Sequence, residues 1–69
     1  MTLEEAKSLK KGDIIESFDG QEYFGGEVIK VDDAEILINW EDGLKGNLPL
    51  DEKSLPFTKD CLSVMKLIK

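Results

Sequence analysis

The chain has 69 residues, of which 15 are acidic and 9 basic, with a formal net charge of −6 at pH 7. This length suits one small domain, and no apolar run approaches the roughly 20 residues that span a bilayer. The N-terminal sequence opens with acidic residues and lacks the apolar core of a secretory signal, so we expect a cytoplasmic protein that does not bind membranes.

The residue types exclude most catalytic and metal chemistry. There is no histidine and only one cysteine, Cys61. The chain therefore lacks the usual zinc and copper ligands and any Ser-His or Cys-His pair. We expect no enzyme activity, no metal and no cofactor, and we expect Cys61 to be a small buried hydrophobic residue.

Negative charge is concentrated in the first half of the chain. Residues 13–42 contain ten acidic residues and one basic residue, Lys30, which gives this segment a charge of −9. Such a field repels phosphate and attracts cations, and the chain contains no arginine. We therefore expect no direct binding of nucleic acid, and we expect a protein or peptide partner with a cationic surface.

The first predicted element is a short helix over residues 2–9. Thr2 and Glu5 have the spacing of a capping box, and Leu3, Ala6 and Leu9 recur at helical spacing. A helix of about two turns is too short to be stable alone, so its apolar side chains are expected to pack on the rest of the domain.

Three strands are predicted to follow, over residues 13–17, 23–31 and 35–40. Asp19-Gly20 marks the turn between the first two strands, and the glycine pair Gly25-Gly26 predicts a bulge or sharp bend in the second. In the third strand the alternation places Ile36, Ile38 and Trp40 on one face.

The C-terminal part is less regular. Residues 45–50 are predicted to form a fourth strand, at an edge of the sheet because of Pro49, and residues 51–55 a 3₁₀ turn that ends at Pro56. For residues 61–68 two interpretations stay open. One is a fifth strand, which we favour; the other is a helix capped by Thr58, because apolar residues recur there at helical spacing.

Five short strands with a 3₁₀ turn before the last are typical of an SH3-like barrel. The predicted fold class is therefore all-β, with a short N-terminal helix. Residues 1–69 are expected to form a single domain, in which residues 1–12 are the helix and lead-in and residues 13–69 the barrel.

Three motifs in this region resemble the Tudor domain, a member of the SH3-like barrels. They are residues 18–20 (FDG), 24–32 (FGGEVIKVD) and 36–43 (ILINWEDG). Residues 48–50 (LPL) and 54–56 (SLP) are similar to the fourth strand and 3₁₀ turn of that family. The resemblance covers about residues 13–56.

Tudor domains bind methylated lysine or arginine in an aromatic cage. The resemblance implies walls formed by Phe18, Phe24 and Trp40 and a rim formed by two acidic residues, Asp42 and Glu41. A methylated ammonium group is attracted to ring faces by about 0.5 to 2 kcal/mol per contact. We expect Trp40→Ala to abolish binding and to leave the fold intact.

A secondary candidate for the same site is Tyr23. Its side chain is expected to point away from that of Phe24, because successive residues of a strand alternate between faces.

Other interpretations of the same residues stay open. The three rings are also what a small barrel needs for core packing. The chain as a whole fits an adaptor that docks on a larger assembly through its flank or an open sheet edge, or an acidic mimic of nucleic acid. We favour a non-catalytic, monomeric binding module.

Overall fold

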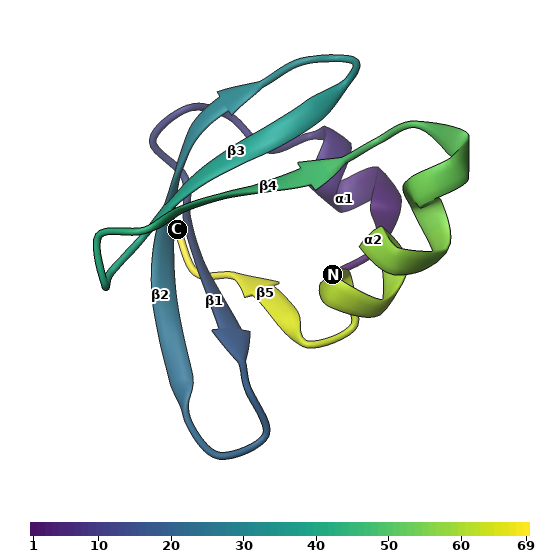
Figure 1. Cartoon of the computed structure of the whole chain (residues 1–69). Coiled ribbons are helices and arrows are strands. Elements are labelled where there is room, and N and C mark those ends of the chain that lie inside the picture. Colours follow the sequence, from purple (N-terminus) through teal and green to yellow (C-terminus); the bar gives the residue numbers. More distant parts are fainter.

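The computed structural model describes residues 1–69 as one five-stranded antiparallel sheet with two short α-helices (Figure 1). The strands are β1 (Ile14–Phe18), β2 (Tyr23–Val31), β3 (Glu35–Trp40), β4 (Lys45–Pro49) and β5 (Met65–Leu67). Their order in the sheet is β4-β3-β2-β1-β5, so β4 and β5 are the two edges. The predicted five strands and mostly β fold are confirmed, but the sheet is not closed.

The strand positions follow from alternating apolar residues. Ile15 in β1, Val28 in β2, and Ile36 and Ile38 in β3 are almost completely buried. The predicted bounds of β2 and β3 are correct, and β1 lies one residue later than predicted. The edge position predicted for β4 is also confirmed.

The irregularity in β2 does not lie at the glycine pair, where it was predicted. Gly25 and Gly26 pair regularly with Glu16 and Ile15 of β1, whereas the register with β3 shifts between Val28 and Lys30. The prediction failed because a glycine in a strand can mark either a bend or the close approach of another group, and the sequence does not distinguish the two. Here it indicates close approach.

The N-terminal helix α1 (Leu3–Lys7) has the predicted capping box. The Glu5 backbone N–H donates to Thr2 Oγ1 (3.1 Å), and the Thr2 N–H donates to Glu5 Oε1 (2.9 Å). Ala6 is fully buried and Leu9 nearly so, which confirms that this segment packs on the sheet.

The segment before β5 contains the predicted 3₁₀ turn and, directly after it, an α-helix. The 3₁₀ turn η1 covers Glu52–Ser54 and continues directly into helix α2 (Leu55–Leu62). Pro56 does not end the turn, because proline is compatible with the first turn of an α-helix. The strand interpretation holds only for Met65–Leu67, and Thr58 lies inside α2 rather than capping it.

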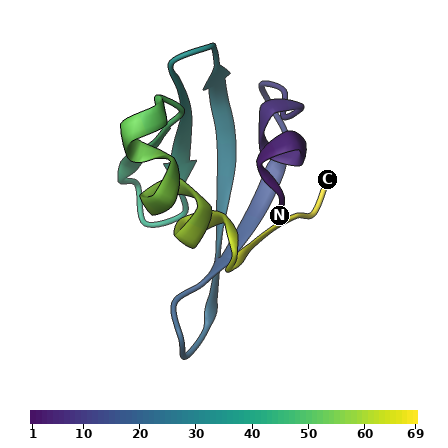
Figure 2. The same cartoon turned by 90° about the vertical axis from the view of Figure 1, so that its right-hand side faces the viewer.

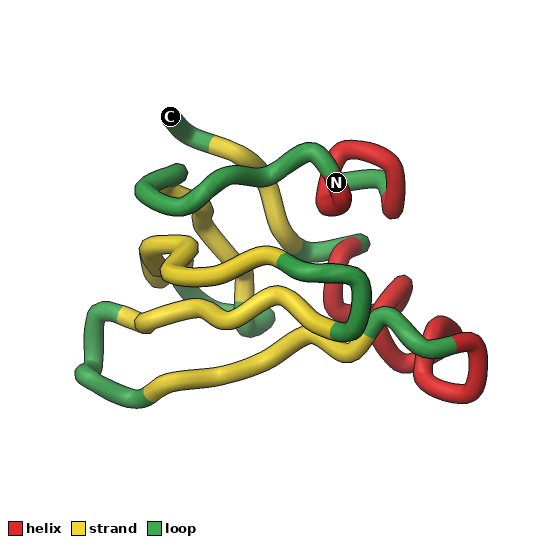
Figure 3. The backbone as a smooth tube through the Cα atoms, turned by 90° about the horizontal axis from the view of Figure 1, so that it is seen from above, coloured by secondary structure: helices red, strands yellow, loops and turns green.

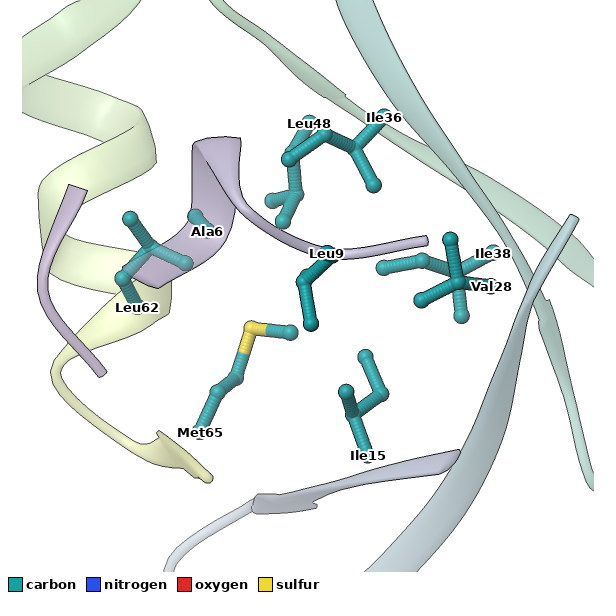
Figure 4. Packing of buried hydrophobic residues seen from close by; sticks show 9 residues of the cluster. All are labelled: Ala6, Leu9, Ile15, Val28, Ile36, Ile38, Leu48, Leu62 and Met65. Atoms are coloured by element: carbon teal, nitrogen blue, oxygen red, sulfur yellow. The ribbon is translucent and has the colours of Figure 1, made fainter. Parts of the chain in front are cut away.

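Both helices lie on one side of the sheet, as Figure 2 and Figure 3 show. The core lies between them and the strands, and Figure 4 shows its side chains pointing toward one another. Its nine residues come from both helical segments and all five strands: Ala6, Leu9, Ile15, Val28, Ile36, Ile38, Leu48, Leu62 and Met65. Neither helix has the length and apolar character needed to cross a membrane.

Two hydrogen bonds attach the start of the chain to its end. The Met1 ammonium group donates to the carbonyl oxygens of Leu62 (3.0 Å) and Met65 (2.8 Å). Leu62 lies in the last turn of α2, where a positive charge also interacts favourably with the helix dipole. These contacts position α2 and β5 relative to each other.

Candidate functional site

The aromatic residues form two separate pairs. Phe24 and Trp40 have ring centroids 5.1 Å apart in an edge-to-face arrangement, and Phe18 and Tyr23 have centroids 4.8 Å apart. In the β1–β2 register Ser17 is opposite Phe24, and Phe18 is opposite Tyr23. Phe24 therefore lies on the face of buried Ser17, and Phe18 and Tyr23 lie on the other face.

The structure thus brings together Phe24 and Trp40 of the predicted cage but not Phe18. As expected, Tyr23 points away from Phe24. The Phe18–Tyr23 pair already has a cation from the chain itself, because Lys66 Nζ lies 4.9 Å from the centroid of the Tyr23 ring. This leaves Phe24 and Trp40 as the aromatic residues around which a site can be built.

The Trp40 ring is held against the backbone of both neighbouring strands. A Cβ atom at Gly26 would lie 2.6 Å from Trp40 Cε3, and one at Gly46 would lie 2.8 Å from Trp40 Nε1. Only glycine leaves room for the indole at these two positions. Trp40 is half-buried and packs against the core, so it supports the fold and the candidate site together.

The turn between β3 and β4 positions two predicted rim residues, Glu41 and Asp42. The Gly43 N–H donates to the Trp40 carbonyl (2.9 Å), and Gly43 has a φ of +86°, which favours glycine. Asp42 Oδ1 accepts from the Leu44 N–H (2.9 Å). The Glu41 N–H donates to the Gly25 carbonyl (2.9 Å), which attaches this turn to β2.

These carboxylates line a hollow together with two from the β1–β2 turn. The hollow has a volume of about 300 Å³ and is lined by Asp19, Glu22, Phe24, Glu41 and Asp42. We call it the acidic hollow. Asp19 and Glu22 were not among the predicted site residues, although their turn lies next to Phe24 in the chain.

The acidic hollow has no positive charge of its own. Its lining contains no lysine, and the two ion pairs of the chain lie elsewhere, between Lys30 and Asp32 (3.2 Å) and between Lys66 and Glu16 (3.5 Å). Backbone N–H groups of Glu22 and Gln21 donate to Asp19 and hold the pKa of its carboxyl below its usual value. Asp19 is therefore ionised at neutral pH.

Beside the acidic hollow lies an apolar groove, which sequence analysis did not predict. It has a volume of about 270 Å³, and eight of its 11 lining residues are hydrophobic. Its walls come from all five strands and α2: Ser17, Phe24, Ile38, Trp40, Gly46, Asn47, Leu48, Phe57, Cys61, Val64 and Met65. The helical spacing of Phe57, Cys61 and Val64 was the one signal of this groove in the sequence.

The remaining side chains offer little further chemistry. No group of three or more His, Cys, Asp or Glu residues is arranged to hold a metal ion. Cys61 is half-buried, at the side of the groove rather than in the core.

Comparison of the chain with protein-family models, with curated proteins and with solved structures gave no match.

Proposed function

We propose that this protein is a small non-catalytic binding module that takes a cationic side chain of a protein or peptide in the acidic hollow. One observation carries the proposal: four acidic residues line the same hollow as Phe24, and neither ion pair of the chain involves them. The likeness of residues 13–56 to Tudor domains agrees with this proposal and with an SH3-like barrel type of fold.

The chemistry of the acidic hollow suits lysine and arginine. A cation over the Phe24 face gains about 0.5 to 1 kcal/mol at an exposed site, and the Phe24 ring packs against Trp40 at 5.1 Å between centroids. Carboxylates around the ring add charge-assisted contacts and attract a cationic partner over several ångströms. A methylated ammonium keeps its charge and its attraction to the ring, so both forms of lysine belong in the test.

The proposal is tested by NMR titration of the ¹⁵N-labelled protein with peptides that contain one lysine or arginine, unmethylated or methylated. We expect shifts of the Trp40 indole N–H and of the Glu41 and Asp42 amides. A folded protein in which none of these signals moves with any peptide would contradict the proposal.

A charge-matched pair of variants sharpens the test. Glu22→Gln combined with Glu41→Gln removes two charges from the acidic hollow, and we expect affinity for the basic peptide to fall about three- to tenfold. Asp33→Asn combined with Glu52→Gln removes two charges elsewhere, from exposed side chains without hydrogen bonds or ion pairs. Equal losses in the two double variants would indicate only the overall charge.

The alternative function is a structural adaptor that docks on a larger assembly without recognising methyl-lysine. The observation that favours it is the open sheet, whose edge strands β4 and β5 have no strand partner on one side. In that case a partner protein would shift the amides of Lys45 and Asn47 in β4, and the acidic hollow would not respond to peptides.

A further inference from the structure

We propose that the apolar groove takes a large apolar side chain of the same peptide whose basic residue occupies the acidic hollow. The predicted ligand is thus an extended segment in which leucine, isoleucine, methionine or an aromatic residue lies two positions from lysine or arginine. The basic half of this inference rests on the proposed function, and the apolar half rests on the groove alone.

The groove exists because the sheet is open. Strand β4 contributes Gly46, Asn47 and Leu48 to one wall. Met65 at the start of β5 and Val64 just before it contribute to the opposite side. Helix α2, which connects these edges in Figure 1, covers the core but leaves Phe57 60% exposed and Val64 43% exposed. An apolar ligand group that removes this exposed surface from water therefore gains affinity.

The size of the groove suits a side chain rather than a whole organic ligand. Its volume of about 270 Å³ lies at the small end of the range of about 300 to 1,000 Å³ found for small-molecule sites, and it is large enough for one bulky side chain. Most of the lining is apolar, and its polar side chains are Ser17 and Asn47. This lining favours a hydrophobic group without charge.

The two subsites are adjacent, because Phe24 lines both of them. Alternate residues of an extended peptide lie on the same side of the backbone and are separated by about 6.6 Å. A peptide that passes over Phe24 can therefore place one side chain in each subsite. This adjacency sets the spacing of two positions.

Charge decides between a basic peptide and a second copy of this chain. A second copy would bring a net charge of −6, with −9 in its own residues 13–42, against the same acidic surface. Like charges would oppose that contact, whereas a segment with lysine or arginine beside its apolar residue is attracted to it.

Cys61 provides a direct reporter of occupancy. It is the only cysteine of the chain, it lines the groove, and it is half-buried rather than inaccessible. The probes are glycine-serine peptides that carry leucine and lysine two positions apart, lysine alone, or leucine alone. We expect the first peptide to slow the reaction of Cys61 with a disulfide reagent, and the lysine-only peptide to leave that rate unchanged.

Affinity gives a second readout of the same inference. We expect the leucine-lysine peptide to bind about tenfold or more tightly than the lysine-only peptide. Phe57→Ser should remove this gain and leave the lysine-only affinity unchanged, and it should not unfold the protein because Phe57 is mostly exposed. The control is Ile68→Ser, which changes an exposed apolar residue outside the groove.

The outcomes separate the two proposals. If leucine adds no affinity and no protection of Cys61 while lysine still shifts Glu41 and Asp42, the groove inference is overturned and the proposed function stands. If leucine protects Cys61 but lysine shifts no signal of the acidic hollow, the groove remains a subsite and the proposed function fails.

Discussion

Thr58 is a buried polar residue whose side chain connects helix α2 to strand β4. Its side chain is completely buried in α2, and Oγ1 donates a hydrogen bond of 2.6 Å to the Pro49 carbonyl at the end of β4. This contact attaches the helix to the edge of the sheet. The Pro49 carbonyl is part-buried, so the loss of its only side-chain donor leaves it poorly satisfied and costs stability.

We expect Thr58→Val to lower the free energy of unfolding by about 1 to 3 kcal/mol, because it keeps the shape and removes the donor. Thr58→Ser keeps the donor and loses one methyl group, at a cost of about 1 kcal/mol. Urea unfolding of both variants measures the difference. A valine variant as stable as the serine variant would show that the hydrogen bond contributes nothing.

Trp40 contributes to the stability of the fold as well as to the candidate site. The sequence led us to expect that Trp40→Ala would leave the fold intact, but the indole packs against the core and fills the space above Gly26 and Gly46. We now expect Trp40→Ala to cost about 3 kcal/mol, a large part of the about 3 to 10 kcal/mol available to a domain of this size. Thermal unfolding measures this loss. The better probe of the ligand contact is Phe24→Leu.

At the scale of the strand, the two glycines of β2 have different reasons to be glycine. A Cβ at Gly26 would lie 2.6 Å from Trp40 and 2.7 Å from Ile38, whereas a Cβ at Gly25 would meet nothing closer than 3.6 Å. We expect Gly26→Ala to destabilise the protein by about 1 to 3 kcal/mol. Gly25→Ala should be neutral or stabilising by about 0.5 kcal/mol, since alanine restricts the unfolded chain.

Chemical denaturation of these two neighbouring variants tests whether the Trp40 ring lies where the structure has it. The substitutions are identical, and both positions pair regularly with β1, so strand propensity affects them alike. Equal stability of the two variants would mean that the indole is not packed over Gly26.

Elements with a regular apolar pattern could be predicted from the sequence, and elements that depend on distant partners could not. The alternation Ile36, Ile38, Trp40 fixes the face of β3 without further information. The register shift in β2 depends on how β3 pairs with it, and no local signal marks it. Helix α2 was missed because Pro56 was interpreted as an end rather than as part of the first turn.

The same distinction applies to the site. The aromatic and acidic site residues were predicted from the resemblance to Tudor domains, and the structure places Phe24 beside Trp40 and in one hollow with Glu41 and Asp42. Phe18 was assigned to this group although its place in β1, one residue after Ser17, directs it to the other face. The groove needed the open edges of the sheet, which no local pattern reveals.

At the scale of the whole molecule, acid should destabilise the fold through its turns. Asp19 and Asp32 each accept two backbone N–H bonds, from residues 21 and 22 and from residues 34 and 35, respectively. These bonds, first from Glu22 and from Glu35, hold the pKa of both carboxyls below the usual value, with a smaller contribution from Lys30 at Asp32. Because the folded pKa is the lower one, this stability is present above about pH 4 and is lost as pH falls through the folded pKa.

The matched variant is Asp19→Asn combined with Asp32→Asn, which keeps an oxygen acceptor in each turn and removes the titration. We expect the stability of the natural protein to fall more steeply than that of the variant between about pH 5 and pH 2. Urea unfolding at several pH values measures both curves. The relief of repulsion among the other acidic residues is common to both proteins, so parallel curves would contradict the assignment.

The place of β5 in the sheet also sets an order of events in folding. Strands β1 to β4 pair with their neighbours in the chain, but β5 pairs with β1, and its partners Leu67 and Ile15 come from opposite ends of the sequence. Closing so long a loop costs more entropy than forming a hairpin, and the segment that offsets that cost is short: the three residues of β5 and the backbone bonds of residues 64, 68 and 69 to β1. The four-stranded meander is therefore expected to form first and β5 to dock last, which makes the amides of β5 the fastest of the sheet in native-state hydrogen exchange. The wall that β5 and residue 64 give to the groove would then open before the rest of the molecule unfolds.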